Sequence, residues 1–179
     1  MAEPITLQTV LTYLTLISVP VGVFYYILSL RNQDRARQVQ TFLSIYRTIS
    51  TPEHLDKLNK LLAMEWDDYH DFEMKYGSDV NPENRTLRYS TWYLYDGIGF
   101  ILKKGWIDRD VMFALLNTAS IHWLWDRQAS LIKEIRRRYN LPNLAIHFEY
   151  LVEEHKKLLL ERGQSPEPPE AYGKYIPDQ

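Results

Sequence analysis

Cysteine is absent from the 179 residues of this sequence. The chain therefore cannot form a disulfide, bind a metal through thiolates or use a thiol as a nucleophile. A second absence is local. The segment from Ile5 to Leu30 contains no Asp, Glu, Lys, Arg or His, although charged residues make up 25% of the whole sequence. This uncharged segment is the most informative feature of the chain.

The segment from Ile5 to Leu30 has the length and composition of a membrane-spanning helix. A helix rises about 1.5 Å per residue, so the segment would be longer than the ~30 Å hydrocarbon core of a bilayer. Glu3 is the only charged residue before it, and Ser29-Leu30-Arg31 lacks the small-residue pattern of a signal-peptide cleavage site. We therefore predict one permanent span. A signal peptide and a buried core helix are the alternatives.

The basic residues predict how the span is oriented. Arg31, Arg35 and Arg37 follow the uncharged segment closely, whereas no Lys or Arg precedes it. Because short cytoplasmic segments carry an excess of positive charge, we expect the N-terminus outside the cell and the rest of the chain in the cytoplasm. The predicted location is the cell membrane, with a single pass.

The remainder of the chain shows helical periodicity and no strand pattern, so the predicted fold is all-α. We expect a transmembrane anchor at residues 1–30, a cytoplasmic helical bundle at 31–163 and a polar, proline-rich tail at 164–179. The anchor should continue as one helix to about Ile49, because neither Gly nor Pro lies between Leu30 and Ile49. About five to six helices should form the bundle, with segments expected at 52–76, 85–104, 109–117, 119–139 and 143–161.

Local signals support several of these boundaries. Ser50, with Glu53 three residues later, is expected to cap the helix that starts near Pro52, and Gly77 should end it. Asp108 is expected to cap the short helix from 109. An apolar stripe formed by Val39, Phe42, Tyr46 and Ile49 should pack on the protein's own core, with a seam between two copies as the alternative.

Asp67, His70 and Asp71 are the strongest candidates for metal ligands. Carboxylates and an imidazole on one helical face can hold a divalent cation, but structural metal sites usually take ligands from more than one element. We interpret the cluster as an exposed acidic surface and leave metal binding open.

No cofactor is expected, because Gly97-Ile98-Gly99 lacks the third glycine and the preceding strand of a dinucleotide-binding motif. We do not predict an enzyme. Catalysis would require a pocket in which Asp96, His122 or His155 converge with shifted pKa values.

Asp96 lies in the most apolar of the predicted helices. A buried carboxylate needs a partner or a raised pKa. We predict that Asp96 pairs with an arginine of the 119–139 helix, Arg136 or Arg127. The alternative is that Asp96 faces water.

An interface is predicted on the same long helix. Trp123 should lie on the far side from Trp125, and an exposed tryptophan often anchors a contact. Lys133, Arg137 and Arg138 form a basic patch together with Arg136, which suits acidic headgroups or the helix dipole.

A membrane-tethered regulator is the alternative function, because the helices that flank Gly105-Trp106-Ile107-Asp108 resemble a helix-turn-helix that binds nucleic acid. The net charge of −2 does not favour it.

The order of residues is similar to an uncharacterised family of prokaryotic single-pass membrane proteins with a cytoplasmic helical domain of unknown function. The matching residues run from Trp92-Tyr93-Leu94-Tyr95-Asp96 through Gly105-Trp106-Ile107-Asp108, then Trp123-Leu124-Trp125, Glu134-Ile135-Arg136 and Phe148-Glu149-Tyr150-Leu151. The resemblance implies an N-terminal span followed by a helical part. It implies no activity, since the motifs consist mostly of packing residues.

These observations predict a membrane-anchored interaction protein, either an accessory subunit of a membrane complex or a tethered scaffold. Its expected partners are the lipid bilayer and a second protein in the membrane or another copy of the chain. Nucleic acid is not expected to bind.

Overall fold

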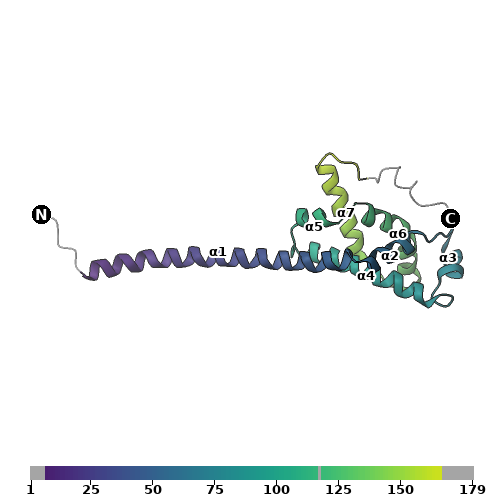
Figure 1. Ribbon diagram of the computed structural model, residues 1–179, viewed down its shortest axis with the longest axis horizontal. Helices are drawn as coiled ribbons and strands as arrows, with labels where there is room; N and C mark the ends of the chain where they lie inside the picture. The colour runs from purple at the N-terminus through teal and green to yellow at the C-terminus, as the bar shows by residue number, and fades with distance from the viewer. Residues whose placement is uncertain (1–6, 117, 167–179) are drawn as a thin grey trace. The chain divides into compact units, whose positions relative to one another are not determined.

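The computed structural model describes residues 7–116 and 118–166. Seven α-helices form the regular structure of these described residues, and no strand occurs among them, so the all-α prediction is confirmed (Figure 1). The helices are α1 (Leu7–Ile49), α2 (Pro52–Leu62), α3 (Tyr69–Tyr76), α4 (Pro82–Lys103), α5 (Arg109–Leu115), α6 (Thr118–Tyr139) and α7 (Ile146–Glu161). Most of the predicted tail, from residue 167 onward, lies outside the described residues.

The chain divides into two compact units, Met1–Thr41 and Phe42–Gln179. In the first unit, none of the residues from 7 to 41 is buried. An 18-residue window of α1 has a mean hydropathy of 1.8, and none of it is covered by protein. By length and composition, α1 is therefore able to cross a membrane. Pro20 lies inside the helix without ending it, as is common in membrane-spanning helices.

The second unit has its own hydrophobic core, to which the last residues of α1 contribute. Ile45 is buried, and Phe42 and Ile49 pack against the core, whereas Tyr46 is exposed. The predicted stripe thus docks on the protein's own core through only part of its residues. The α4 helix packs mainly against α7, and it also contacts α2. Its side chains at Trp92 and Tyr95 are almost completely buried, so α4 contributes two large aromatic residues to the core.

The helix predicted at residues 52–76 is two helices. The carboxylate of Asp68 accepts a hydrogen bond from the N–H of Asp71 at 2.8 Å, which caps α3 and lets a new helix begin there. The cap of α2 is Thr51 rather than Ser50, because the Thr51 hydroxyl accepts from the N–H of His54 at 3.1 Å. The predicted stop at Gly77 and the predicted cap at Asp108 are both confirmed.

Candidate functional site

Asp96 is half-buried on α4 and caps the start of α7. One of its carboxylate oxygens accepts hydrogen bonds from the N–H groups of His147 at 2.7 Å and Phe148 at 3.1 Å. Ala145, the residue before α7, has a left-handed backbone (φ 55°) and no side chain able to cap. The first N–H groups of a helix have no partner within that helix. Asp96 therefore supplies from α4 the cap that the sequence around α7 lacks.

Arg136 has partners other than Asp96. Its Nε donates to the carbonyl oxygen of Leu144 at 2.7 Å, and a terminal nitrogen donates to Glu149 at 2.8 Å. Arg127, the other predicted partner, lies 3.9 Å from Glu65. No ion pair joins Asp96 to either arginine among the described residues. The prediction is corrected because the backbone N–H groups of α7, rather than a cation, satisfy the Asp96 carboxylate.

The close approach of α7 to α4 depends on Gly99. A Cβ atom at this position would lie within van der Waals overlap of the carbonyl oxygen of His147. At Gly97, by contrast, a Cβ atom would meet no heavy atom within 4 Å. Asp96 and Gly99 therefore form a docking motif for α7. Of the two glycines in Gly97-Ile98-Gly99, only Gly99 is needed for this contact.

The predicted basic patch on α6 is exposed but mostly paired. Arg137 and Arg138 each bind a carboxylate oxygen of Glu134 at 2.7 Å, and Lys133 lies 3.8 Å from Glu149. The hydrogen bonds from Arg137 and then Arg138 lower the pKa of Glu134 to about 2. Because nearby carboxylates offset these cations, the patch attracts phosphate groups less strongly than the sequence suggests.

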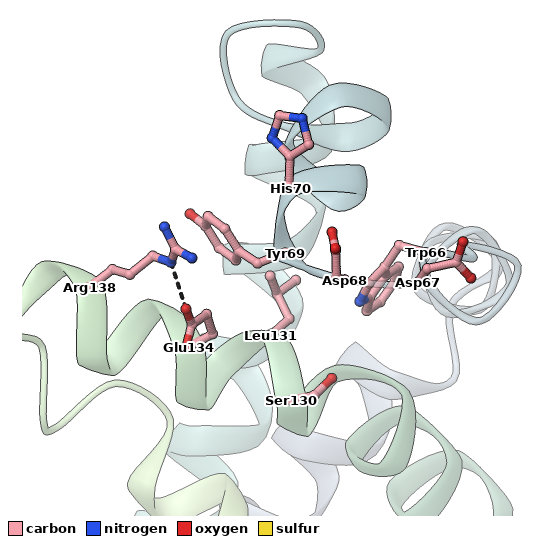
Figure 2. Close-up of a pocket in the computed structure, with 9 residues that line it drawn as sticks. All are labelled: Trp66, Asp67, Asp68, Tyr69, His70, Ser130, Leu131, Glu134 and Arg138. Atoms are coloured by element: carbon pink, nitrogen blue, oxygen red, sulfur yellow. Dashed lines mark hydrogen bonds and ion pairs between the residues drawn. The ribbon is translucent and has the colours of Figure 1, made fainter.

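A hollow of about 400 Å³ is lined by residues 66–70, at and before the start of α3, and by residues in the C-terminal half of α6. Figure 2 shows Arg138 beside Tyr69 and bonded to Glu134. The Arg138 guanidinium carbon is 4.2 Å from the centre of the Tyr69 ring. The lining residues are Trp66, Asp67, Asp68, Tyr69, His70, Ser130, Leu131, Glu134 and Arg138. The cation that the Tyr69 ring could bind is thus already supplied by the chain itself.

Two residues of the candidate metal cluster, Asp67 and His70, line this hollow. The carboxylate of Asp71 accepts hydrogen bonds from the N–H of Asp67 at 3.0 Å and from Lys75 at 2.8 Å. Lys75 in particular lowers the pKa of Asp71. Within the described residues, no group of three or more His, Asp or Glu side chains is arranged to hold a metal ion. The carboxylates of Asp68 and Asp71 instead accept hydrogen bonds from backbone N–H groups at the start of α3.

His122 and His155 form a buried pair between α6 and α7. Their rings lie 5.0 Å apart, and Phe113 stacks on His155 at 4.5 Å. One ring nitrogen of His122 is hydrogen-bonded to the carbonyl oxygen of Pro166 at 2.8 Å. Burial, with smaller contributions from His122 and Arg162, lowers the pKa of His155 to about 4. Both imidazoles are therefore neutral near pH 7. Asp96 does not join them, because its carboxylate caps α7.

Trp106, rather than Trp123, is the exposed tryptophan of the chain. Trp123 is half-buried on α6, whereas 60% of the Trp106 surface is accessible. Gly105 adopts a left-handed backbone (φ 67°). The N–H of Gly105 donates to Leu102 and that of Trp106 to Ile101, at 2.9 and 3.2 Å. This pattern is the Schellman motif, and it fixes the turn that presents the indole.

Aromatic rings and lysines surround Trp106. The Trp106 ring contacts the Phe100 ring edge-on at 5.7 Å. Lys104 lies 5.5 Å from the centre of the Phe100 ring, and Lys103 lies 5.5 Å from that of Tyr150. We call these five residues the Trp106 surface. Both lysines are exposed.

A family described as a domain of unknown function (DUF4760) matches residues 12–155. The chain belongs to this family. The match begins within the apolar part of α1 and ends in α7, so the DUF4760 domain contains the Asp96 cap, the hollow and the Trp106 surface. A search of the curated proteins and a search of the solved structures found no match. The predicted resemblance to an uncharacterised family is confirmed, and the family assigns no activity.

Sequence reasoning found the acidic and basic clusters of the DUF4760 domain but missed its exposed tryptophan, Trp106. The signal was present, because a glycine that ends a helix places the next residue in a surface turn. Trp123 was chosen by its position opposite Trp125 on one helix. That reasoning takes no account of α6 contacting both α2 and α7, which leaves α6 fewer exposed faces.

Proposed function

We propose that this protein is a single-pass membrane protein whose second unit acts by binding another protein, as an accessory subunit of a membrane complex or as a tethered scaffold. The observation that best supports this proposal is the exposure of the apolar side chains of α1. Its apolar side chains from Leu7 to Leu30 are exposed along the whole segment. Soluble proteins rarely expose contiguous apolar surface of this extent, and a bilayer would cover it.

The proposal includes an orientation. Arginines at positions 31, 35 and 37 directly follow the apolar segment, and the described part of the segment contains no ionisable group other than tyrosine. Positive charge at the C-terminal end of a span favours its retention in the cytoplasm. The second unit would then be cytoplasmic.

Two features support binding rather than catalysis. The buried imidazole of His155 contacts the rings of Phe113 and His122, and neither histidine lines the hollow beside Asp67 and Glu134. The charged groups on the α6 side of that hollow are already bonded to each other. A partner-binding role requires no such pocket, only an exposed surface.

Membrane insertion and orientation can be tested because the chain contains no cysteine. Single cysteines would be introduced by Glu3→Cys and, separately, Gln164→Cys in the full chain. We expect the protein to resist alkaline carbonate extraction, and a membrane-impermeant maleimide to label only position 3 in intact cells. Release by carbonate would refute the span, and labelling of position 164 alone would reverse the orientation.

The interaction role is tested separately by purification of the tagged full chain from its native membranes in mild detergent. We expect a stoichiometric second protein, or a second copy of the chain, to remain bound after a chemical cross-link. A chain that purifies alone as a monomer, from cells in which cross-linking of a known complex succeeds, would contradict the role.

A further inference from the structure

We infer that the Trp106 surface docks on an anionic lipid surface, namely the headgroups of the membrane that the predicted span would cross. The inference rests on the proposed membrane anchoring and adds a second contact between the protein and the bilayer. It concerns lipid phosphates rather than a protein partner. The residues that carry it are Trp106, Lys103 and Lys104, supported by Phe100 and Tyr150.

The indole of Trp106 is held in position to enter a membrane interface. The two backbone hydrogen bonds at Gly105 and Trp106 fix the turn after α4, so the accessible ring is presented by rigid backbone. Tryptophan is enriched at the headgroup level of bilayers because its ring is largely apolar and carries one polar N–H. The exposed indole of Trp106 matches this use.

The two lysines supply exposed positive charge. Neither Lys103 nor Lys104 takes part in any of the salt bridges of this part of the chain. Each ammonium lies over an aromatic ring, so the apolar stems follow the rings while the charged ends reach water.

Two carboxylates that lie near the Trp106 surface in sequence already have partners. Asp108 accepts hydrogen bonds from the N–H groups of Asp110 and Val111 at the start of α5. Glu149 is bound by Arg136 and approached by Lys133. The two lysines, which form no salt bridge among the described residues, complement an anionic headgroup layer.

Lipid phosphates fit this surface better than an acidic protein does. Lysine is a compact point charge that does not require a partner of fixed geometry, whereas specific carboxylate or phosphate sites in proteins favour the bidentate guanidinium of arginine. Each lysine near an anionic membrane increases binding about fivefold. Two lysines would not hold a soluble protein, but a tethered domain faces its membrane at roughly millimolar effective concentration.

The test places a fluorophore at the surface of the full chain in lipid nanodiscs. Trp106→Cys is labelled with a nitrobenzoxadiazole dye, which replaces the indole by another flat ring. Tyr93→Cys is the matched control, because Tyr93 lies on α4, the helix that leads into this turn, and is also 60% exposed. The nanodiscs contain phosphatidylcholine alone, or equal parts of phosphatidylcholine and phosphatidylglycerol, with a spin-labelled lipid as the quencher.

We expect stronger quenching at position 106 than at 93, and only with phosphatidylglycerol present. Lys103→Gln with Lys104→Gln should lower the ratio of docked to free domain by about 25-fold. The charge-matched control, Lys57→Gln with Lys60→Gln on α2, should leave the ratio unchanged. Circular dichroism of each variant checks that the fold is retained.

Equal quenching at positions 93 and 106, or quenching that does not depend on phosphatidylglycerol, would overturn the inference. So would protection of position 106 that requires added membrane protein, which would assign the surface to a protein partner. Carbonate extraction separates this failure from that of the proposed function. A chain that remains inserted while position 106 stays unquenched is still anchored but does not dock.

Discussion

Two helices rich in apolar residues, α1 and α4, differ in what covers them. The side chains of α1 between residues 7 and 41 are not buried by protein, whereas α4 buries Trp92, Tyr95 and Ile98 in the core. Their sequences differ accordingly. The α4 helix carries Asp96 and Gly99, which fit one particular neighbour, and the apolar segment of α1 carries no charged residue. Apolar content alone thus does not decide between a protein core and a lipid environment; residues specific to one contact do.

The largest effect should come from filling the contact between α4 and α7. Gly99→Ala places a methyl group onto the carbonyl oxygen of His147, and this clash is with backbone. We expect the free energy of unfolding in detergent to fall by about 3 kcal/mol or more. Gly97→Ala is the control. It should raise the free energy of unfolding by at most about 1 kcal/mol, because alanine has the higher helix propensity. Equal effects at the two glycines would show that α7 does not approach α4 closely.

The same comparison can be made with charge. Leu16→Arg near the middle of the predicted span should reduce membrane insertion by about 3 kcal/mol, measured as the glycosylated fraction of a reporter segment. Tyr93→Arg, at an exposed position of α4, should change the stability of the second unit by less than ~0.5 kcal/mol. If Leu16→Arg leaves insertion unchanged, α1 is not a span.

Acid should weaken the second unit and leave α1 intact. His155 has a folded pKa of about 4 against an ordinary value of 6.5, so its neutral form is favoured by folding. The resulting stability is complete above pH 6.5, declines as the pH falls, and is lost below pH 4. At pH 5 the loss should be about 2 kcal/mol. Chemical unfolding at pH 7.5 and pH 5 measures it.

His155→Phe is the control for this pH effect. Phenylalanine cannot be protonated and suits the stacked position against Phe113. The variant should lose much of the pH dependence between 7.5 and 5. His122 should keep a smaller dependence of the same sign, because burial also lowers its pKa. An unchanged pH dependence in the variant would assign the acid sensitivity to other groups.

The smallest effect should come from the cap. Asp96→Ala removes the acceptor for the N–H groups of His147 and Phe148, and we expect a loss of about 1–2 kcal/mol. Asp96→Asn keeps an acceptor oxygen and should lose less. Charge reversal of Asp96 together with Arg136 should give no rescue, because these residues do not pair. Rescue would restore the ion pair that the sequence suggested.

Sequence reasoning recovered what local chemistry determines. The unbroken course of α1 to Ile49, the stop at Gly77 and the cap at Asp108 each depend on residues close together in the chain. The division of residues 52–76 was missed because Asp68 was given no capping role. The side chain of Asp68 competes for a backbone N–H, and nothing in the helical periodicity reports that.

The candidate sites were harder to predict, because they depend on which helices meet. The partner of Asp96 is a backbone segment 51 residues away, and sequence patterns identify charged partners more readily than free N–H groups. The sequence identified the residues of the basic patch. It did not predict that they pair with Glu134 and Glu149. Trp123 is half-buried and Trp106 is exposed because of how the helices pack. A helical wheel drawn for one helix gives no information on that packing.

The cap that Asp96 provides also has a consequence for the order in which the chain acquires its structure. Because α7 lacks a capping side chain of its own, it gains this stabilisation only after α4 is in place. During synthesis α4 leaves the ribosome first, and its aspartate remains solvated until the chain has grown past Phe148. We therefore expect α7 to be the last helix to become protected from hydrogen exchange, and ribosome-bound chains that end at Tyr139 to have an α4 surface open to chaperones.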